Sequence, residues 1–487
     1  MADTGTALSP GLKNRHVTMI SIAGVIGAGL FVGSGEAIAT AGPGVLISYA
    51  FAGLLVVLVM RMLGEMAAAN PDSGSFSTYS DRAIGPWAGF TVGWLYWWFW
   101  VLVIPLEATA AATILTSWTP SIPQWVWALA ITVVLTATNL FSVANYGEFE
   151  FWFALLKVIA IIGFIGLGLL AVFGILPTSD VSGVSHLYDS GGFLPNGFGA
   201  VVAAVLVTMF SFMGTEIVTI AAAESKNPEE QIGRATRSVI WRIATFYLAS
   251  IFLVVALVPW NDPALPEKGS YQAALEAMGI PGAKAIVDVV VLVAVASCLN
   301  SALYTASRMI YSLGRRGDAP AATMRTSNGV PRVAVLASTA VGFLAVIANY
   351  AVPEKVFSTL IATSGAIALI VYLAIAVSQL KLRRRFEAEG REMPVRMWAY
   401  PVLTWAVIVV IPVILIYMAI RPASRFDLAM TALITALVVA ASFVVARRKG
   451  HGRSAPERMC GMAAMAVANI MEMRPPITSV IAGPSPR

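Results

Sequence analysis

Apolar residues occur in long runs along most of the chain, with short polar segments between them. At about 20 residues for each crossing of a bilayer, this pattern predicts twelve transmembrane helices. Helices satisfy their own backbone hydrogen bonds where no water is available, so we expect an all-α membrane protein. The expected spans are 17–39, 44–66, 88–115, 125–144, 152–175, 198–222, 240–260, 284–307, 333–351, 356–378, 400–420 and 427–446.

Composition supports the same class. Of the 487 residues, 58% are hydrophobic and 12% are charged, whereas soluble proteins carry about 25% charged residues. A single soluble core cannot bury this much apolar surface. The first run is long enough to span a membrane and does not end in a small-residue cleavage site, so we expect a helix there and not a cleaved signal peptide.

Basic residues are unevenly divided between the two sets of connections. If the N-terminus is cytoplasmic, most of the 32 Lys and Arg residues lie in cytoplasmic segments or at the helix ends next to them. The outer connections and their helix ends contain Lys268, Lys284, Lys355, Arg421 and Arg425. Cytoplasmic loops are rich in Lys and Arg. We therefore expect a multi-pass protein of the cytoplasmic membrane with both termini inside, and the net charge of +6 requires no nucleic-acid partner.

Three parts follow from this topology. Residues 1–16 form a cytoplasmic N-terminal segment, and residues 17–446 form the transmembrane domain. Residues 447–487 contain Pro, Met and small residues without a clear period, so we expect a disordered cytoplasmic tail.

Residue types that serve metal sites and enzymes are scarce. The only cysteines are Cys298 and Cys460, and the three histidines, His16, His186 and His451, all lie outside the predicted spans. Neither a zinc-binding spacing nor a phosphate-loop motif occurs. We expect no enzyme activity, no cofactor and no metal.

Two predicted helices contain residues that weaken a helix. In the first, "SIAGVIGAGLFVGSGEAI", the glycines include Gly24, Gly27 and Gly29, and each costs about 1 kcal/mol relative to Ala. The sixth, "VVAAVLVTMFSFMGTEIVTIAAAES", has Gly214 and the acid Glu216 near its centre. A broken helix persists in a membrane only where it lines a cavity enclosed by protein. Close helix packing is the alternative explanation for the glycines.

The two weak helices are five helices apart, which predicts two inverted repeats, about 17–175 and 198–378, with two extra helices in 400–446. Helices 1 and 6 are then discontinuous. The N–H groups at a half-helix start suit an anion, and freed carbonyl groups suit an ammonium. A ligand with both charges, an amino acid, fits such a pair of breaks.

The segment "AGPGVLISYAFAGLLVVLVMRMLGEMAAANP" resembles the signature of bacterial and fungal amino-acid permeases, members of the amino acid–polyamine–organocation superfamily. The segments "NYGEFEFWFALLKVIAI", "FSFMGTEIVTIAAAES" and "SCLNSALYTASRMIYSL" resemble members that carry GABA (4-aminobutyrate). The resemblance extends from "GLKNRHVTMISIAGVIGAGLF" to about Lys449 and excludes the tail. It implies the LeuT-like fold of five plus five helices, alternating access, and proton symport of GABA or a related ω-amino acid.

The resemblance also implies a binding site at the two breaks. The backbone of the first break holds the substrate carboxylate, and the sixth helix supplies an aromatic gate and a glutamate. Some relatives have Trp at the gate position, where this chain has Phe210. The residues implied for substrate binding are Ile26, Gly27, Ala28, Gly29, Phe210, Ser211, Phe212 and Glu216.

Two residues are candidates for proton coupling. A proton-coupled relative has a Lys at the position of Lys157, and a buried Lys can lose its proton; the alternative is an ammonium that reaches the membrane interface. Glu216 is the second candidate, and its alternative role is to hold the unwound backbone. Glu107 lies in another span and follows Pro105, so it either lines the pathway or satisfies backbone groups freed by the proline.

A polar stripe formed by Cys298, Ser301 and Thr305 either lines the pathway or packs against another helix. The expected partners are therefore an amino acid, protons and lipid. A permease for an aromatic or proline-like amino acid is the first alternative function, and an amino-acid sensor is the second.

Overall fold

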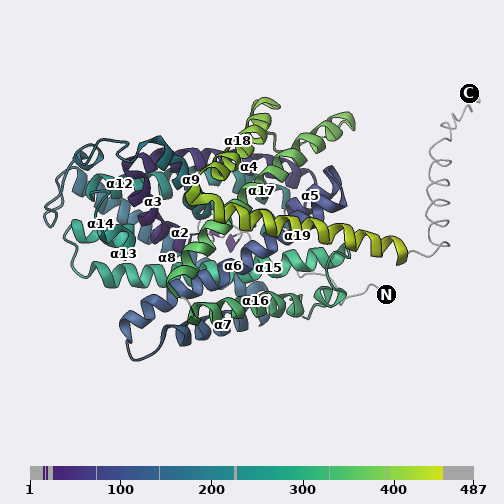
Figure 1. Ribbon diagram of the computed structural model, residues 1–487, viewed down its shortest axis with the longest axis horizontal. Helices are drawn as coiled ribbons and strands as arrows, with labels where there is room; N and C mark the ends of the chain where they lie inside the picture. Colours follow the sequence, from purple (N-terminus) through teal and green to yellow (C-terminus); the bar gives the residue numbers. More distant parts are fainter. Residues whose placement is uncertain are drawn as a thin grey trace, which may run out of the picture. The chain divides into compact units, whose positions relative to one another are not determined.

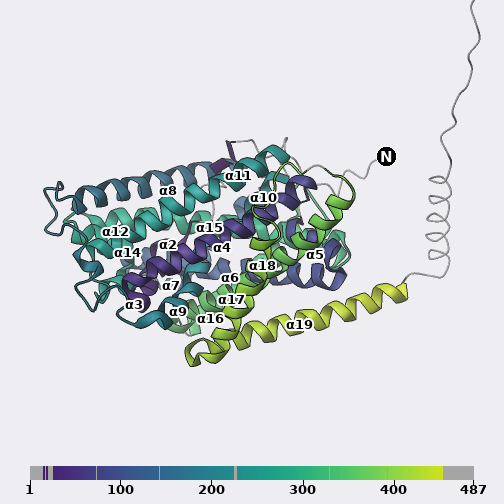
Figure 2. The same ribbon diagram turned by 90° about the horizontal axis from the view of Figure 1, so that it is seen from above.

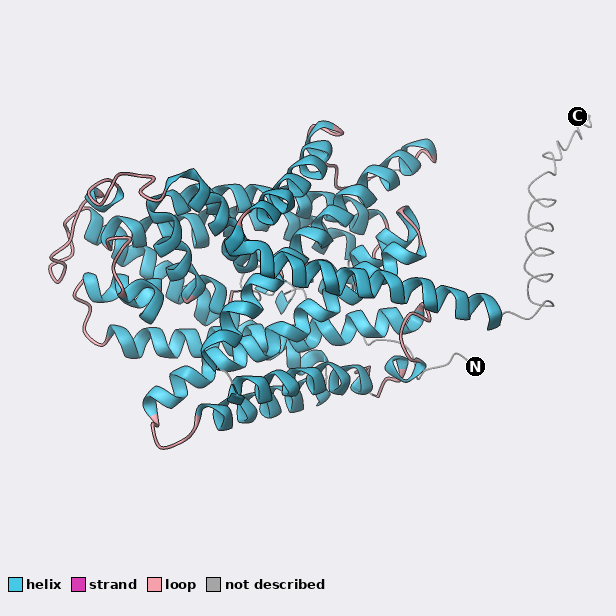
Figure 3. Ribbon diagram, in the orientation of Figure 1, coloured by secondary structure: helices cyan, strands magenta, loops and turns pink. Residues whose placement is uncertain are grey.

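The structure is a computed structural model that describes residues 15–16, 18–19, 26–72, 74–141, 143–223, 228–327, 329–351, 353–391 and 393–452. The described elements are all helices, joined by loops (Figure 3). One isolated β-bridge pairs Ser327 with Val330. Of the predicted tail 447–487, residues 447–452 are helical, and residues 453–487 lie outside the described residues, as do residues 20–25 with Gly24. The chain divides into two compact units, Met1–Val439 and Ala440–Arg487.

The first half of the chain begins with short helices and continues with long ones. Gly42 has φ +65° and begins a 3-10 turn, Gly42–Gly44, that contains Pro43. This turn lies between the helix that ends at Ala41 and the helix that begins at Val45. The helices in this half are α2 (Ala28–Phe31), α3 (Gly33–Ala41), α4 (Val45–Ala69), α5 (Ser75–Ala83), α6 (Pro86–Trp118), α7 (Gln124–Phe141) and α8 (Val143–Val172).

The second half has the same mixture of short and long helices. The helices are α9 (Gly197–Phe212), α10 (Ile217–Ala223), α11 (Pro228–Arg242), α12 (Ser250–Leu257), α13 (Ala264–Lys268), α14 (Ser270–Ala277), α15 (Ala283–Arg315), α16 (Arg332–Ala351), α17 (Pro353–Ala388), α18 (Val402–Ile420) and α19 (Pro422–Gly452). A π-helical turn, Ile243–Ala249, joins α11 to α12.

Helices from the two halves pack against each other in the first unit. The long helices α6 and α15 lie side by side (Figure 1), and α3 and α4 both pack on α9. Seen from above, α12 lies beside α8 (Figure 2). Residues far apart in sequence therefore meet at the centre of this unit, between α2, α6, α8, α9 and α15.

Among the described residues, ten helical stretches are long and apolar enough to cross a membrane, fewer than the twelve predicted. One of them, Ala28–Ala69, covers residues 28–39 of the first predicted span and all of the second, 44–66. Helix α16 matches the predicted span 333–351 but is not among the ten. These helices give a multi-pass membrane protein.

Candidate functional site

The break predicted for the first helix falls directly before α2. Ile26 and Gly27 are not helical, and α2 starts at Ala28. The N–H group of Ala28 donates to both carboxylate oxygens of Glu107, at 3.2 Å to Oε2 and 3.4 Å to Oε1. Glu107, on α6, is 1% exposed. A carboxylate from another helix therefore occupies the positive end of α2.

Gly27 permits this close approach. A Cβ atom at Gly27 would lie 2.6 Å from Oε1 of Glu107 and 2.8 Å from Cβ of Cys298 on α15. Both distances are shorter than real carbon contacts, so any side chain here would displace α6 or α15 groups. This explains Gly27 by the approach of neighbouring helices to the unwound backbone.

Lys157 contacts the other side of the same break. Its Nζ donates to the carbonyl oxygen of Ile26 at 3.2 Å and to Oγ of Ser297 at 2.8 Å. The side chain is fully buried on α8, so it does not extend to a membrane interface. The ammonium group thus binds a carbonyl that the break leaves without a helical partner.

The second break separates α9 from α10. Met213 is extended, with ψ 144°, and Gly214 has φ +96°, a conformation that side chains disfavour. The N–H group of Gly214 donates to Oε1 of Glu216 at 3.1 Å. Glu216 also accepts from Tyr96 Oη, at 3.0 Å, and from Tyr372 Oη, at 3.4 Å. The carboxylate therefore holds the break in which it lies.

The two breaks are bonded to each other. Oγ of Ser211 donates to the carbonyl oxygen of Gly29 at 2.8 Å, and Tyr247 Oη donates to the carbonyl oxygen of Ser211 at 2.9 Å. The Phe210 ring lies against Gly29, since a Cβ there would be 3.0 Å from Phe210 Cδ1. Movement at one break must therefore change contacts at the other.

A small cavity lies between the breaks. It leaves about 10 Å³ for the centre of a water-sized molecule, room for about one water molecule. An amino acid would enter only if the lining side chains moved apart. The lining residues are Gly27, Gly29, Phe99, Trp100, Val103, Glu107, Phe210, Ser211, Met213 and Cys298.

The structure groups the sequence-predicted residues into two sets. Glu107 and Cys298 line the cavity together with Gly27, Gly29, Phe210 and Ser211. Phe212 instead packs on Tyr247, with ring centroids 4.5 Å apart. Glu216, Ser301 and Thr305 are buried but are not among the residues that line the cavity.

Several residues around the site were not predicted from the sequence. Glu150 on α8 is fully buried, and its Oε1 lies 3.9 Å from Nζ of Lys157. Ser297 lies between them. Tyr96 and Tyr372 bind Glu216 as described above. The sequence carried one signal for Glu150. It is the second acid of "GEFEFWF", it is surrounded by aromatic residues, and it stands seven residues before Lys157.

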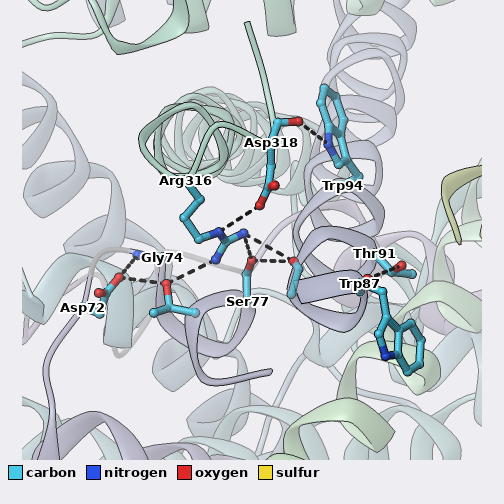
Figure 4. Close-up of polar contacts among 10 residues, drawn as sticks. Asp72, Gly74, Ser77, Trp87, Thr91, Trp94, Arg316 and Asp318 are labelled. Atoms are coloured by element: carbon cyan, nitrogen blue, oxygen red, sulfur yellow. Dashed lines mark hydrogen bonds and ion pairs between the residues drawn. The ribbon is translucent and has the colours of Figure 1, made fainter. Parts of the chain in front are cut away.

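A second polar cluster surrounds Arg316, just after α15 (Figure 4). The guanidinium donates to Oγ of Ser77 at 2.6 Å and to the carbonyl oxygen of Gly89 at 3.3 Å. It also forms an ion pair with Asp318, at 3.1 Å. The cluster ties α5 and α6 to the end of α15, and none of these residues lines the cavity between the breaks.

Comparison with known proteins places the chain among permeases. Residues 16–450 match the family described as amino acid permease. The chain is 67% identical over 445 residues to a probable GABA permease of Pseudomonas aeruginosa, covering 91% of this chain and 94% of that protein. It is 63% identical over 443 residues to the gamma-aminobutyric acid permease of Escherichia coli K12, covering 91% and 95%.

A solved structure shows the same fold. The manganese transporter of Eremococcus coleocola superposes with a TM-score of 0.55 at 14% sequence identity, covering 91% of this chain and 97% of that one. This similarity concerns the fold alone. From the family match over most of its length, the chain is a member of the amino acid permease family.

Proposed function

We propose that this permease imports GABA, or a related ω-amino acid, together with a proton by alternating access in the cytoplasmic membrane. The observation that carries the proposal is the non-helical backbone at Ile26 and Gly27, next to which two buried charged side chains bind beside a small cavity. The two relatives named for GABA, at 67% and 63% identity, support the substrate.

The proposed topology has twelve crossings with both termini inside. The described helices support it because Ala28–Ala69 contains the predicted span 44–66 and residues 28–39 of the span before it, and α16 has the length of another span. We further propose that helices 1 and 6 are discontinuous, within inverted repeats 17–175 and 198–378 followed by the extra helices in 400–446. The ends of α9 and α10 at Phe212 and Ile217 support the break in helix 6.

The substrate carboxylate binds the backbone from Ile26 to Gly29 in this proposal. The N–H group of Ala28 now donates to Glu107, so the substrate must displace this carboxylate. A displaced Glu107 remains at the cavity, where it can pair with the substrate ammonium. Phe210 and Ser211 line the opposite wall, and Phe210 acts as the gate.

Glu216, the acid in the second break, is our second assignment for the substrate ammonium. Its carboxylate already accepts hydrogen bonds from Gly214, Tyr96 and Tyr372. Glu107 is our first assignment for the ammonium because it lines the cavity. Phe212, behind the gate, supports the position of helix 6 through its contact with Tyr247.

Lys157 is our first assignment for proton coupling, and Glu216 is the second. Lys157 is buried and binds the carbonyl of Ile26, the first residue of the proposed carboxylate site. A proton gained or lost at Nζ would change this hydrogen bond, since charged donors bind more strongly than neutral ones.

Uptake into liposomes tests the function. The purified protein, with an inward proton gradient, should accumulate labelled GABA, and unlabelled β-alanine should compete more strongly than proline or phenylalanine. If proline or phenylalanine is transported and GABA is not, the substrate belongs to the alternative class of permease. Binding without any uptake would instead indicate a sensor.

A further inference from the structure

Two charged side chains are buried on one face of α8. Glu150 and Lys157 are seven residues apart, or about two helical turns, and both are fully buried. Their Oε1 and Nζ atoms are 3.9 Å apart. The proposed substrate contacts make no use of Glu150, and burying a charge pair is costly unless its members are closely matched.

Ser297 of α15 connects the two groups. Nζ of Lys157 donates to its Oγ at 2.8 Å, and the same Oγ donates to Oε1 of Glu150 at 2.5 Å. A hydroxyl group has one proton to donate and lone pairs to accept another. The three side chains thus form a continuous hydrogen-bonded path from an ammonium to a carboxylate.

One end of this path contacts the first break. Nζ of Lys157 also donates to the Ile26 carbonyl at 3.2 Å, and Ile26 is two residues before Ala28. A change in the charge of Lys157 therefore reaches the backbone to which we assign the substrate carboxylate.

Other titratable groups face Lys157 from two neighbouring helices. Glu107 of α6 and the thiol of Cys298 on α15 interact electrostatically with it, as Glu150 does from α8 itself. Glu148, near the start of α8, is instead 41% exposed and pairs with Arg15 at 2.7 Å. Among these groups, Ser297 joins the carboxylate of Glu150 directly to Lys157.

We propose that Glu150 and Lys157 share one proton through Ser297, and that this pair, not the lysine alone, is the coupling group. The inference rests on the proposed proton symport and adds Glu150 and Ser297 to it. Interacting groups of this kind titrate as a unit.

The shared proton moves in a balanced step. Lys157 passes a proton to Oγ of Ser297 while the hydroxyl proton of Ser297 moves to Oε1 of Glu150. A neutral amine and a carboxylic acid remain, and no other bond changes. Release of the proton from Glu150 to water leaves a carboxylate, and uptake of one proton from the opposite side restores the pair. The neutral amine binds the Ile26 carbonyl more weakly than the ammonium does, which frees the first break.

Glu150→Gln in liposomes tests the proposal. Gln still accepts a hydrogen bond from Ser297 but cannot take up a proton. Exchange of labelled for unlabelled GABA needs no net proton movement and should persist. Accumulation driven by a pH gradient, and proton entry reported by an internal pH dye, should fall about tenfold or more. The pH dependence of exchange should also flatten.

Matched variants separate the proton role from a structural one. Glu148→Gln removes an exposed carboxylate two residues away and should accumulate GABA like the wild type. Glu150→Asp keeps a carboxyl group and should restore part of the accumulation. Ser297→Ala leaves both charged groups and should slow proton entry while exchange persists. Full accumulation with an unchanged pH profile in Glu150→Gln, or in Ser297→Ala if the first variant does not fold, would overturn the proposal.

The wild-type protein distinguishes the two proposals. If it moves an amino acid other than GABA together with protons, the substrate proposal fails, and the same variants are measured with that amino acid. If it moves amino acids without protons under every gradient, both the symport and the shared proton are wrong.

Discussion

The breaks before Ala28 and after Phe212 both place a buried carboxylate against a backbone N–H group, but the carboxylates come from different places. At the first break the acid is Glu107, 79 residues away on α6, and the opposing cation is Lys157 on α8. At the second break the acid is Glu216, two residues from the amide that it binds.

This difference assigns different roles to the two breaks. The first is held from outside, and we propose that a substrate carboxylate or a proton releases it by replacing Glu107 or by changing Lys157. The second is held by its own carboxylate and by two tyrosine hydroxyls, and we propose that it keeps its shape during transport. Our central claim is that the first break carries binding and coupling, and that the second supports the structure.

The largest expected effect is on stability. Glu216→Ala removes the acceptor for Gly214, Tyr96 and Tyr372, and each buried donor left unpaired costs about 1–3 kcal/mol. We expect the free energy of unfolding to fall by about 3 kcal/mol or more, seen as a lower melting temperature of the protein in detergent. Glu216→Gln retains an acceptor and should lose less. Equal melting temperatures for Glu216→Ala and the wild type would show that the second break does not depend on its acid.

A pair of glycine variants tests the approach of helices to the first break. Gly27→Ala places a Cβ 2.6 Å from Glu107, and overpacking of this kind costs about 1–3 kcal/mol. Transport should fall by about one to two orders of magnitude. Gly33→Ala is the matched control because its Cβ would meet no atom closer than 3.8 Å. Similar uptake rates in both variants would indicate general packing instead of a special role for Gly27.

Lys157→Arg separates charge from titration. Arginine stays protonated at all accessible pH values, so the ion pair persists while proton release is lost. Gradient-driven accumulation of GABA should fall about 30-fold, within the range of coupling energies between sites, and exchange should become independent of pH. Normal accumulation in this variant would exclude Lys157 as the coupling group.

Glu107→Gln should act mainly on substrate binding. Loss of a charged partner for the ammonium costs about 1.5–3 kcal/mol, so the GABA concentration for half-maximal exchange should rise about tenfold or more. The inhibition constant of butyrate, which has no ammonium, should change less. An equal change for both ligands would remove the assigned ammonium contact.

The smallest effect is expected far from the breaks. Arg316→Gln weakens the cluster that joins α5 and α6 to the end of α15 (Figure 4). Partly exposed ion pairs contribute about 1 kcal/mol or less, so the melting temperature should fall slightly and the GABA affinity should stay unchanged. A large change in affinity would mean that this cluster is linked to the site.

Periodic and local features of the sequence predicted most of the helices. Gly214 has the positive φ that only a glycine adopts readily, and Gly27 lies where Glu107 and Cys298 approach the backbone closely. The sequence left two roles open for Glu107, lining the pathway or serving the backbone near Pro105; in the structure its carboxylate binds Ala28 on another helix and lines the cavity.

The partners across helices could not be predicted in the same way. Tyr96 is 120 residues from Glu216, and Ser297 is 140 residues from Lys157. One hydroxyl in an apolar run gives no periodic signal, and its partner is set by how the helices pack. Glu150 stands two residues from the exposed Glu148, so the sequence alone did not distinguish the buried acid from the acid at the surface.

The most direct test of the central claim is the pH dependence of GABA exchange in Glu216→Gln. If the second break only supports the structure, this variant should retain the pH profile of the wild type and its gradient-driven accumulation, even at a lower melting temperature. A flat pH profile with lost accumulation in Glu216→Gln, together with a normal profile in Lys157→Arg, would contradict the account and move the coupling proton to the second break.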